Sequence, residues 1–191
     1  MMETKSIMIV GVGGQGTLLA SKLLGRLLLS RGYDVKVSEV HGMSQRGGSV
    51  VTYVRWGDRV YSPIIDKGQA DCILSFELLE AARYTEYLKP DGRIIVNSQQ
   101  INPMPVIAGT ASYPENLVEK LGALGIHVDA LDALALAEKA GSSKAVNLVL
   151  MGRLAKHFDF TKEEWMDAIE HSVPPKFLEL NKKAFDLGQS A

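Results

Sequence analysis

A glycine-rich turn between an apolar run and an amphipathic segment constrains the fold of this chain more than any other feature. Residues 7–10 form a short, continuous apolar run of the kind found in strands that are buried on both faces. The next six residues match the pattern G-x-G-x-x-G and supply Gly11, Gly13, Gly14, Gln15 and Gly16. Over residues 17–30, Leu and Ala recur every four positions with Lys22 and Arg26 between them, which predicts an amphipathic helix.

The same alternation of strand-like and helix-like segments continues along the chain. Strands are predicted over residues 34–40, 71–75, 93–97 and 126–130, and a hairpin is predicted over residues 49–65. Helices are predicted over residues 77–88, 114–124, 142–157 and 177–187, and a further helix is predicted to begin at the capping box at residue 161. Strands that alternate with helices indicate a mainly parallel sheet covered on both faces. We therefore expect a single domain spanning residues 1–191, a Rossmann-like three-layer α/β fold with an inserted hairpin and a helical C-terminal tail from about residue 142.

Composition excludes several classes of protein. The 191 residues include 21 Lys and Arg and 22 Asp and Glu, so no charge surplus favours a nucleic-acid or membrane partner. The apolar stretches are shorter than the roughly 20 residues that span a bilayer, and residues 1–6 lack the pattern of a signal peptide, so we expect a cytoplasmic protein. One cysteine, Cys72, cannot supply a disulfide framework or four thiolates for an iron–sulfur cluster, and its apolar neighbours predict a small buried side chain.

Two interpretations of the glycine turn stay open from the residues alone. Glu39 ends the second predicted strand, close to where an acidic residue about 20 positions after the glycines would meet a ribose hydroxyl, which favours an NAD or FAD site. Alternatively, the glycines only make the sharp turn that the fold requires. A Walker P-loop is excluded, because Thr17 and Leu18 replace the Lys and Ser/Thr that bind phosphate and magnesium.

The segment that follows the second predicted strand is rich in hydrogen-bonding side chains and glycine. Its candidate partner-facing or active-site-facing residues are His41, Met43, Ser44, Gln45, Arg46, Gly47, Gly48 and Ser49. Glycines beside polar side chains favour a backbone that approaches another surface closely, whereas the alternative is an ordinary loop with a solvated Arg46. The four histidines lack the spacing of metal ligands, so no metal site and no catalytic residue are predicted on this chain.

Several of these motifs together resemble one known family. The turn at 11–16, H-G-M-S-Q-R-G-G-S-V at 41–50, A-D-C-I-L-S-F-E at 70–77, P-D-G-R-I-I-V-N at 90–97 and A-V-N-L-V-L-M-G at 145–152 are similar to the gamma-type subunits or domains of 2-oxoacid:ferredoxin oxidoreductases. Each motif is weak alone, but together they cover nearly the whole chain. Within the family, the form S-Q-R-G-G-S-V is most similar to the beta subunits of indolepyruvate ferredoxin oxidoreductases.

The resemblance implies a function that the chain performs only with a partner. Enzymes of this family decarboxylate a 2-oxoacid on thiamine diphosphate, pass electrons through iron–sulfur clusters to ferredoxin, and form an acyl-coenzyme A. The resemblance therefore implies that a large alpha-type subunit carries thiamine diphosphate, magnesium and the clusters, while this chain carries no cofactor. A stand-alone NAD(P)- or nucleotide-binding Rossmann protein is the alternative.

Overall fold

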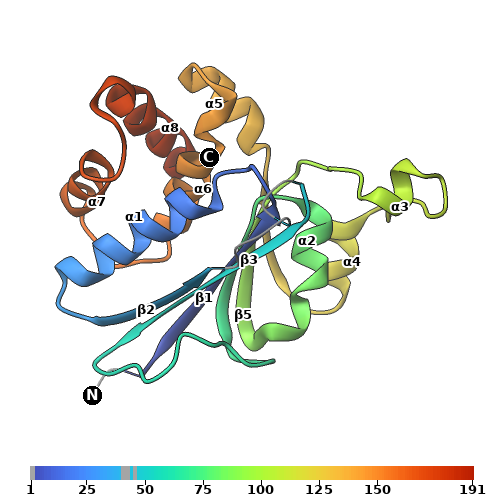
Figure 1. Ribbon diagram of the computed structural model, residues 1–191, viewed down its shortest axis with the longest axis horizontal. Coiled ribbons are helices and arrows are strands. Elements are labelled where there is room, and N and C mark those ends of the chain that lie inside the picture. Colours follow the sequence, from blue (N-terminus) through green and yellow to red (C-terminus); the bar gives the residue numbers. More distant parts are fainter. Residues whose placement is uncertain (1–2, 40–43, 45–46) are drawn as a thin grey trace.

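The computed structural model describes residues 3–39, 44 and 47–191, and it forms one six-stranded sheet with helices on both faces (Figure 1). The strands are β1 (Lys5–Val12), β2 (Asp34–Glu39), β3 (Ser49–Gly57), β4 (Ala70–Ser75), β5 (Leu88–Asn97) and β6 (His127–Leu131). The α-helices are α1 (Thr17–Ser30), α2 (Leu78–Arg83), α3 (Met104–Ile107), α4 (Leu117–Ala123), α5 (Ala133–Ala140), α6 (Val146–Ala155), α7 (Lys162–Glu170) and α8 (Leu178–Ser190). Short 3-10 helices are η2 (Thr85–Tyr87), η3 (Ser143–Ala145) and η4 (Pro175–Phe177).

The strand order is β2-β3-β1-β4-β5-β6, and β3 is the antiparallel member of an otherwise parallel sheet. β1, β4, β5 and β6 run side by side in parallel. β3 lies between β1 and β2, with Gly11 opposite Val50 and Glu39 opposite Thr52. Because β3 is antiparallel, it begins at the edge where the parallel strands end.

Two separate apolar cores hold the three layers together. Ile7, Ile9 and Leu74 face α1 and the C-terminal helices, whereas Met8, Val10 and Ile73 face α2 and α4. This alternation follows from the two-residue period of a strand, and both sets are buried because helices cover both faces. The predicted three-layer α/β architecture is therefore confirmed.

The C-terminal helices pack on the α1 side of the sheet, and α6 and α8 approach each other closely through two glycines. A Cβ at Gly152 would lie 2.0 Å from the carbonyl oxygen of Phe185, and a Cβ at Gly188 would lie 1.9 Å from that of Val149. Only glycine allows this backbone separation. The helical tail is thus part of the main core.

The structure differs from the sequence predictions at several elements. The inserted element is one strand rather than a hairpin, since residues 59–65 are irregular and both edges of β3 are already paired with β1 and β2. Helix α2 ends at Arg83, five residues before the predicted end, because the chain turns through η2 into β5. Helix α5 lies where no helix is predicted. Within the described residues, no helix is long and apolar enough to cross a membrane.

Candidate functional site

The candidate site lies at the carboxyl edge of the sheet, between the ends of β1 and β4. After β1 the chain turns to α1 on one face, and after β4 it turns to α2 on the other face (Figure 1). In open α/β sheets such a divergence leaves a crevice that commonly binds ligands. Here the glycine turn follows β1, and Phe76 and Glu77 follow β4.

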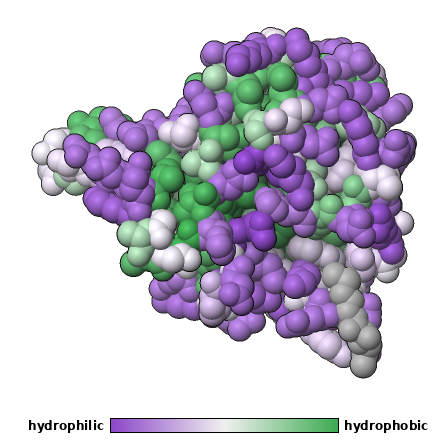
Figure 2. All heavy atoms as spheres, turned by 180° about the vertical axis from the view of Figure 1, so that it is seen from behind, coloured by the Kyte–Doolittle hydropathy of each residue, from purple (hydrophilic) through white to green (hydrophobic). Residues whose placement is uncertain are grey.

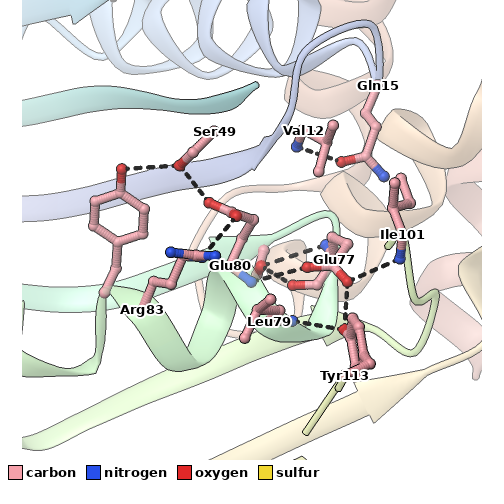
Figure 3. Close-up of polar contacts among 11 residues, drawn as sticks. Val12, Gln15, Ser49, Glu77, Leu79, Glu80, Arg83, Ile101 and Tyr113 are labelled. Carbon is pink, nitrogen blue, oxygen red and sulfur yellow. Dashed lines mark hydrogen bonds and ion pairs between the residues drawn. The ribbon is translucent and has the colours of Figure 1, made fainter. Parts of the chain in front are cut away.

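The side chain of Gln15 bridges the turn after β1 and the end of β4 (Figure 3). Its Oε1 accepts a hydrogen bond from the backbone N–H of Val12 at 2.7 Å. Its Nε2 donates to the carbonyl oxygen of Phe76 at 3.0 Å and to Oε1 of Gln99 at 3.3 Å. Asn97 Nδ2 donates to the same two oxygens, at 3.2 and 3.3 Å. The turn after β1 is therefore joined to the ends of β4 and β5 by side-chain amides.

Close packing explains two of the glycines in the turn. A Cβ at Gly11 would lie 2.9 Å from Gln15 Oε1 and 3.0 Å from the Cβ of Phe76. Gly16 has a φ of +89°, and a Cβ there would lie 3.0 Å from the Asn147 side chain of α6. Both positions need glycine without any ligand, which favours the structural interpretation of the turn.

The loop singled out from the sequence meets the glycine turn. The N–H of Gly13 donates to the carbonyl oxygen of Gly48 at 2.8 Å, and the N–H of Gly48 donates to that of Ser44 at 2.8 Å. Gly47 has a φ of +104°, a conformation that favours glycine. His41, Met43, Gln45 and Arg46 lie outside the described residues. The structure thus brings the two motifs together through Ser44, Gly48 and Gly13.

Ser49 begins β3 and links it to α2. Its hydroxyl donates to the Glu80 carboxylate and lies 3.3 Å from the hydroxyl of Tyr84 (Figure 3). The other oxygen of Glu80 lies 3.2 Å from Arg83 Nε. Burial raises the pKa of Glu80 above its ordinary value, opposed by Ser49 and Arg83. Ser49 therefore contacts a buried acidic group of the same chain.

Glu77 is the most connected carboxylate at this edge, and sequence reasoning missed it. It caps α2, with Oε2 accepting from the N–H of Glu80 at 2.9 Å. Its Oε1 accepts from the N–H of Ile101 at 3.0 Å and from the hydroxyl of Tyr113, whose oxygen accepts from the N–H of Leu79 (Figure 3). Burial, followed by the hydrogen bond to Glu77, raises the pKa of Tyr113. A carboxylate two residues after a buried strand and directly before a helix was the available signal.

The position of Glu39 does not suit a ribose-binding residue. In a Rossmann fold with adjacent first and second strands, the acidic residue ends the strand next to the glycine turn. Here β3 lies between β1 and β2, so Glu39 is farther from the glycine turn by one strand spacing, about 4.8 Å. Its carboxylate accepts a hydrogen bond from Ser21 of α1 at 2.7 Å. Together with the glycines that the packing of the turn itself requires, this placement argues against the dinucleotide-binding alternative.

Two hollows flank the glycine turn. One, of about 320 Å³, is lined by Gly13, Gly14, Thr17, Val50 and Thr52 among others. The second, of about 540 Å³, lies on the other side and is lined by residues that include Gly14, Gln99, Ser143 and Lys144. A helix N-terminus beside a lysine offers favourable electrostatics for an anionic group.

Cys72 and the aromatic side chains of the C-terminal helices α7 and α8 lie in the apolar core. Cys72 is buried, and burial raises the pKa of its thiol to about 12, so it is the small buried side chain that the sequence predicts. Trp165 and Phe185 lie in the core with ring centroids 5.3 Å apart. Among the described residues, no group of three or more His, Cys, Asp and Glu side chains is placed to hold a metal ion.

The fold and the site define a Rossmann-like domain whose glycine turn is joined to the ends of β4 and β5 by its own side chains. Residues 6–191 match the family model described as pyruvate ferredoxin/flavodoxin oxidoreductase, and the chain belongs to that family. It is 45% identical to "Indolepyruvate oxidoreductase subunit IorB" of Thermococcus kodakarensis, over 100% of this chain and 96% of that protein.

Two solved structures are also similar. The gamma subunit of a keto/oxoacid ferredoxin oxidoreductase from Geobacter sulfurreducens has a TM-score of 0.72 at 25% identity and covers 97% of this chain and 96% of its own. A 2-oxoglutarate:ferredoxin oxidoreductase from Magnetococcus marinus has a TM-score of 0.75 at 17% identity. The match covers 98% of this chain but only 31% of the Magnetococcus chain, so there the same fold is one part of a longer polypeptide.

Proposed function

We propose that this chain is the small accessory subunit of a thiamine-dependent 2-oxoacid:ferredoxin oxidoreductase that acts on indolepyruvate or another arylpyruvate. The observation that carries the proposal is the 45% identity to the Thermococcus IorB subunit along essentially the whole of both chains. We propose further that the chain works as a single domain in the cytoplasm.

The chain's own residues support an accessory role. A four-thiolate cluster needs more than the single cysteine of this sequence, and Cys72 is buried in the sheet. The glycine turn is stabilised by the Gln15 side chain, which donates to the carbonyl oxygen of Phe76 at the end of β4. The large alpha-type subunit would therefore hold thiamine diphosphate, magnesium and the iron–sulfur clusters, and would pass electrons to ferredoxin.

The carboxyl edge is the face that we assign to the large subunit. The glycine turn, Ser44 and Gly48 lie together there, joined by backbone hydrogen bonds. We propose that residues 41–49 contact the large subunit and help to complete the active-site region or the channel for coenzyme A, the co-substrate of the complex. Neither a nucleic acid nor a membrane is part of this proposal.

Reconstitution tests the proposal. The isolated chain should be colourless and inactive with indolepyruvate, coenzyme A and a viologen or ferredoxin acceptor. Adding the cognate large subunit should restore activity, with kcat/KM higher for indolepyruvate than for pyruvate or 2-oxoglutarate. Iron–sulfur absorbance from this chain alone, or full activity of the large subunit without it, would contradict the assignment.

Nucleotide titration separates the proposal from the stand-alone alternative. Calorimetry with NAD, NADP or FAD should show no binding by the isolated chain tighter than about 1 mM, or about −4 kcal/mol. Micromolar binding that is lost in Glu39→Ala would instead support a dinucleotide-binding protein.

A further inference from the structure

A long connection between β5 and α4 stands out from the body of the molecule. Residues 98–114, which we call the arm, carry α3 and project beyond α2 and α4 (Figure 1). In the reverse view the arm projects on the left, and its outer end includes green and white spheres (Figure 2). The arm contains no Asp, Glu, Lys or Arg, although such residues make up 23% of the chain. Depletion of charge is typical of the central part of a protein interface.

The tip of the arm exposes large apolar side chains. Met104 is 70% exposed and Ile107 is 65% exposed, and they lie on one turn of helix. Exposed apolar side chains that lie singly are common, but two on an uncharged projection form a surface suited to burial in a partner.

The tip is ordered by its own backbone hydrogen bonds. The N–H of Ala108 donates to the carbonyl oxygen of Met104 at 2.8 Å, and the N–H of Thr110 donates to the carbonyl oxygen of Pro105 at 2.9 Å. Pro103 and Pro105 further restrict the unfolded chain. A tip that is already ordered loses less conformational entropy when it binds.

The base of the arm is held at one buried carboxylate. Glu77 Oε1 accepts from the N–H of Ile101 near the start of the arm and from the hydroxyl of Tyr113 near its end (Figure 3). Glu77 is only 1% exposed and also caps α2. Both ends of the arm are therefore fixed to α2, which sets the direction in which the tip projects.

We propose that the arm is a docking element for the large catalytic subunit, and that Met104 and Ile107 enter an apolar groove of that subunit. This inference rests on the proposed function, because its occupant is the subunit named there. The arm begins at the same carboxyl edge of the sheet at which Ser49 lies. Glu80 connects Ser49 to the base of the arm, because its carboxylate accepts from the Ser49 hydroxyl and its N–H donates to the Glu77 carboxylate. One partner that covers this edge can therefore contact both the residue 41–49 loop and the arm.

Comparison with the Magnetococcus structure favours the large subunit, rather than a second copy of this chain, as the partner of the arm. In the Magnetococcus protein this fold occupies 31% of the chain, so the rest of an oxidoreductase polypeptide is covalently joined to it. A separate subunit lacks that link and must obtain its association from surface contacts. An uncharged, ordered tip supplies such contacts through burial of apolar area.

The test compares two variants in binding to the purified cognate large subunit. Met104→Ser/Ile107→Ser removes both apolar side chains of the tip, and we expect Kd to rise about 100-fold. Leu124→Ser is the matched control, since Leu124 is 74% exposed and lies just before β6, at the end of the sheet where the parallel strands begin, away from the arm. We expect its Kd to stay within about 3-fold of the wild type, and the Tm of both isolated variants to match the wild type.

The possible outcomes distinguish a failure of the arm proposal from a failure of the proposed function. If the wild type binds the large subunit and the double variant binds equally well, the arm proposal is wrong and the proposed function stands. If the wild type does not bind a thiamine-dependent subunit at all, both fail. If sedimentation shows a wild-type dimer that the double variant converts to a monomer, the tip binds a second copy and the proposal is overturned.

A second variant tests the anchor at the base of the arm. Tyr113→Phe removes the hydroxyl that contacts Glu77 and Leu79 while keeping the ring. We expect faster amide hydrogen exchange at Ile101 and a Kd for the large subunit raised about 10-fold, with the same stoichiometry. Faster exchange with unchanged Kd would show that the orientation of the arm is irrelevant to docking and would overturn this part of the proposal.

Discussion

The side-chain amide of Gln15 donates to the carbonyl oxygen of Phe76 at 3.0 Å, which joins the turn after β1 to the end of β4 across the point where the chain diverges to opposite faces. The carbonyl of the same side chain accepts from the N–H of Val12 at 2.7 Å. The family's glycine turn is thus stabilised in this chain by an internal side chain at the place where related folds bind a nucleotide.

Gln15→Ala should therefore destabilise the protein although Gln15 lies in a turn. The substitution leaves the N–H of Val12 and the carbonyl of Phe76 without this partner, and we expect a loss of about 1–3 kcal/mol in the free energy of unfolding. Urea denaturation followed by circular dichroism measures it. Gln100→Ala, at an exposed glutamine of the same edge, should change stability by less than about 0.5 kcal/mol. Equal effects of the two variants would disprove the role of Gln15.

Gly188→Ala should strongly destabilise the packing of α8 on α6. The added Cβ would lie 1.9 Å from the carbonyl oxygen of Val149, so the two helices must separate. Overpacking of this kind costs about 1–3 kcal/mol or more. Gly122→Ala is the control, because a Cβ there meets nothing within 4 Å in helix α4, and it should be neutral or stabilising by up to about 1 kcal/mol. The denaturant midpoint should therefore fall for Gly188→Ala and stay unchanged or rise for Gly122→Ala.

The contact between Arg31 and Glu164 should make stability depend on pH in the acid range. The hydrogen bond from Arg31, followed by that from the N–H of Thr161, lowers the pKa of Glu164 from 4.5 to about 2. Because the folded pKa is below the unfolded one, the charged carboxylate stabilises the protein fully above pH 4.5, and this contribution is lost as the pH falls toward 2. NMR titration of the Glu164 carboxyl carbon measures the folded pKa directly.

Glu164→Gln provides the matching stability measurement. Gln can still accept from the N–H of Thr161 in the capping box, so the variant removes mainly the charge facing Arg31. The Tm difference from wild type should be present at pH 7 and should shrink between pH 4.5 and pH 2. Glu163→Gln controls for the helix dipole, because Glu163 lies in the same first turn. A Tm difference that is constant with pH would contradict the prediction.

The prediction for Arg46 rests on the sequence, since Arg46 lies outside the described residues. A guanidinium offers several fixed donors to a partner, and losing a hydrogen bond to a charged group costs about 1.5–3 kcal/mol. Arg46→Ala should lower the activity of the reconstituted complex by about 10- to 100-fold and leave the Tm of the isolated chain unchanged. Arg46→Lys should restore activity only in part. A lowered Tm with Arg46→Ala would indicate a structural role instead.

Local sequence determined the elements whose signals lie within a few residues. The period of leucines predicts α1 over the observed Thr17–Ser30, and Thr161 and Glu164 form the capping box that their spacing predicts. The glycine turn is where the sequence places it. In these cases the stabilising contacts join residues three or four apart, so the pattern contains the information.

The site depends on contacts between distant residues that no local pattern records. Glu77 meets Tyr113, 36 positions away, and Ser49 meets Glu80, 31 positions away. The residues of the glycine turn are visible in the sequence, but the Gln15 contact to Phe76 depends on the end of β4, 61 positions away. The family motifs indicate the role of the chain, whereas its internal contacts require the folded structure.

The clearest limit of the sequence is the strand that it predicts over residues 59–65. Those residues have strand-like composition, but β3 already pairs with β1 on one edge and β2 on the other, so a returning strand has no edge of β3 to join. Arg55 instead donates to the carbonyl oxygens of Ser62 and Ile64 at 3.1 and 2.8 Å. The sequence determined the elements with strong local signals, such as α1 and the capping box of α7, because propensity and periodicity are local. The tertiary structure decided which strand edges pair, because an edge accepts one partner and long-range packing selects it.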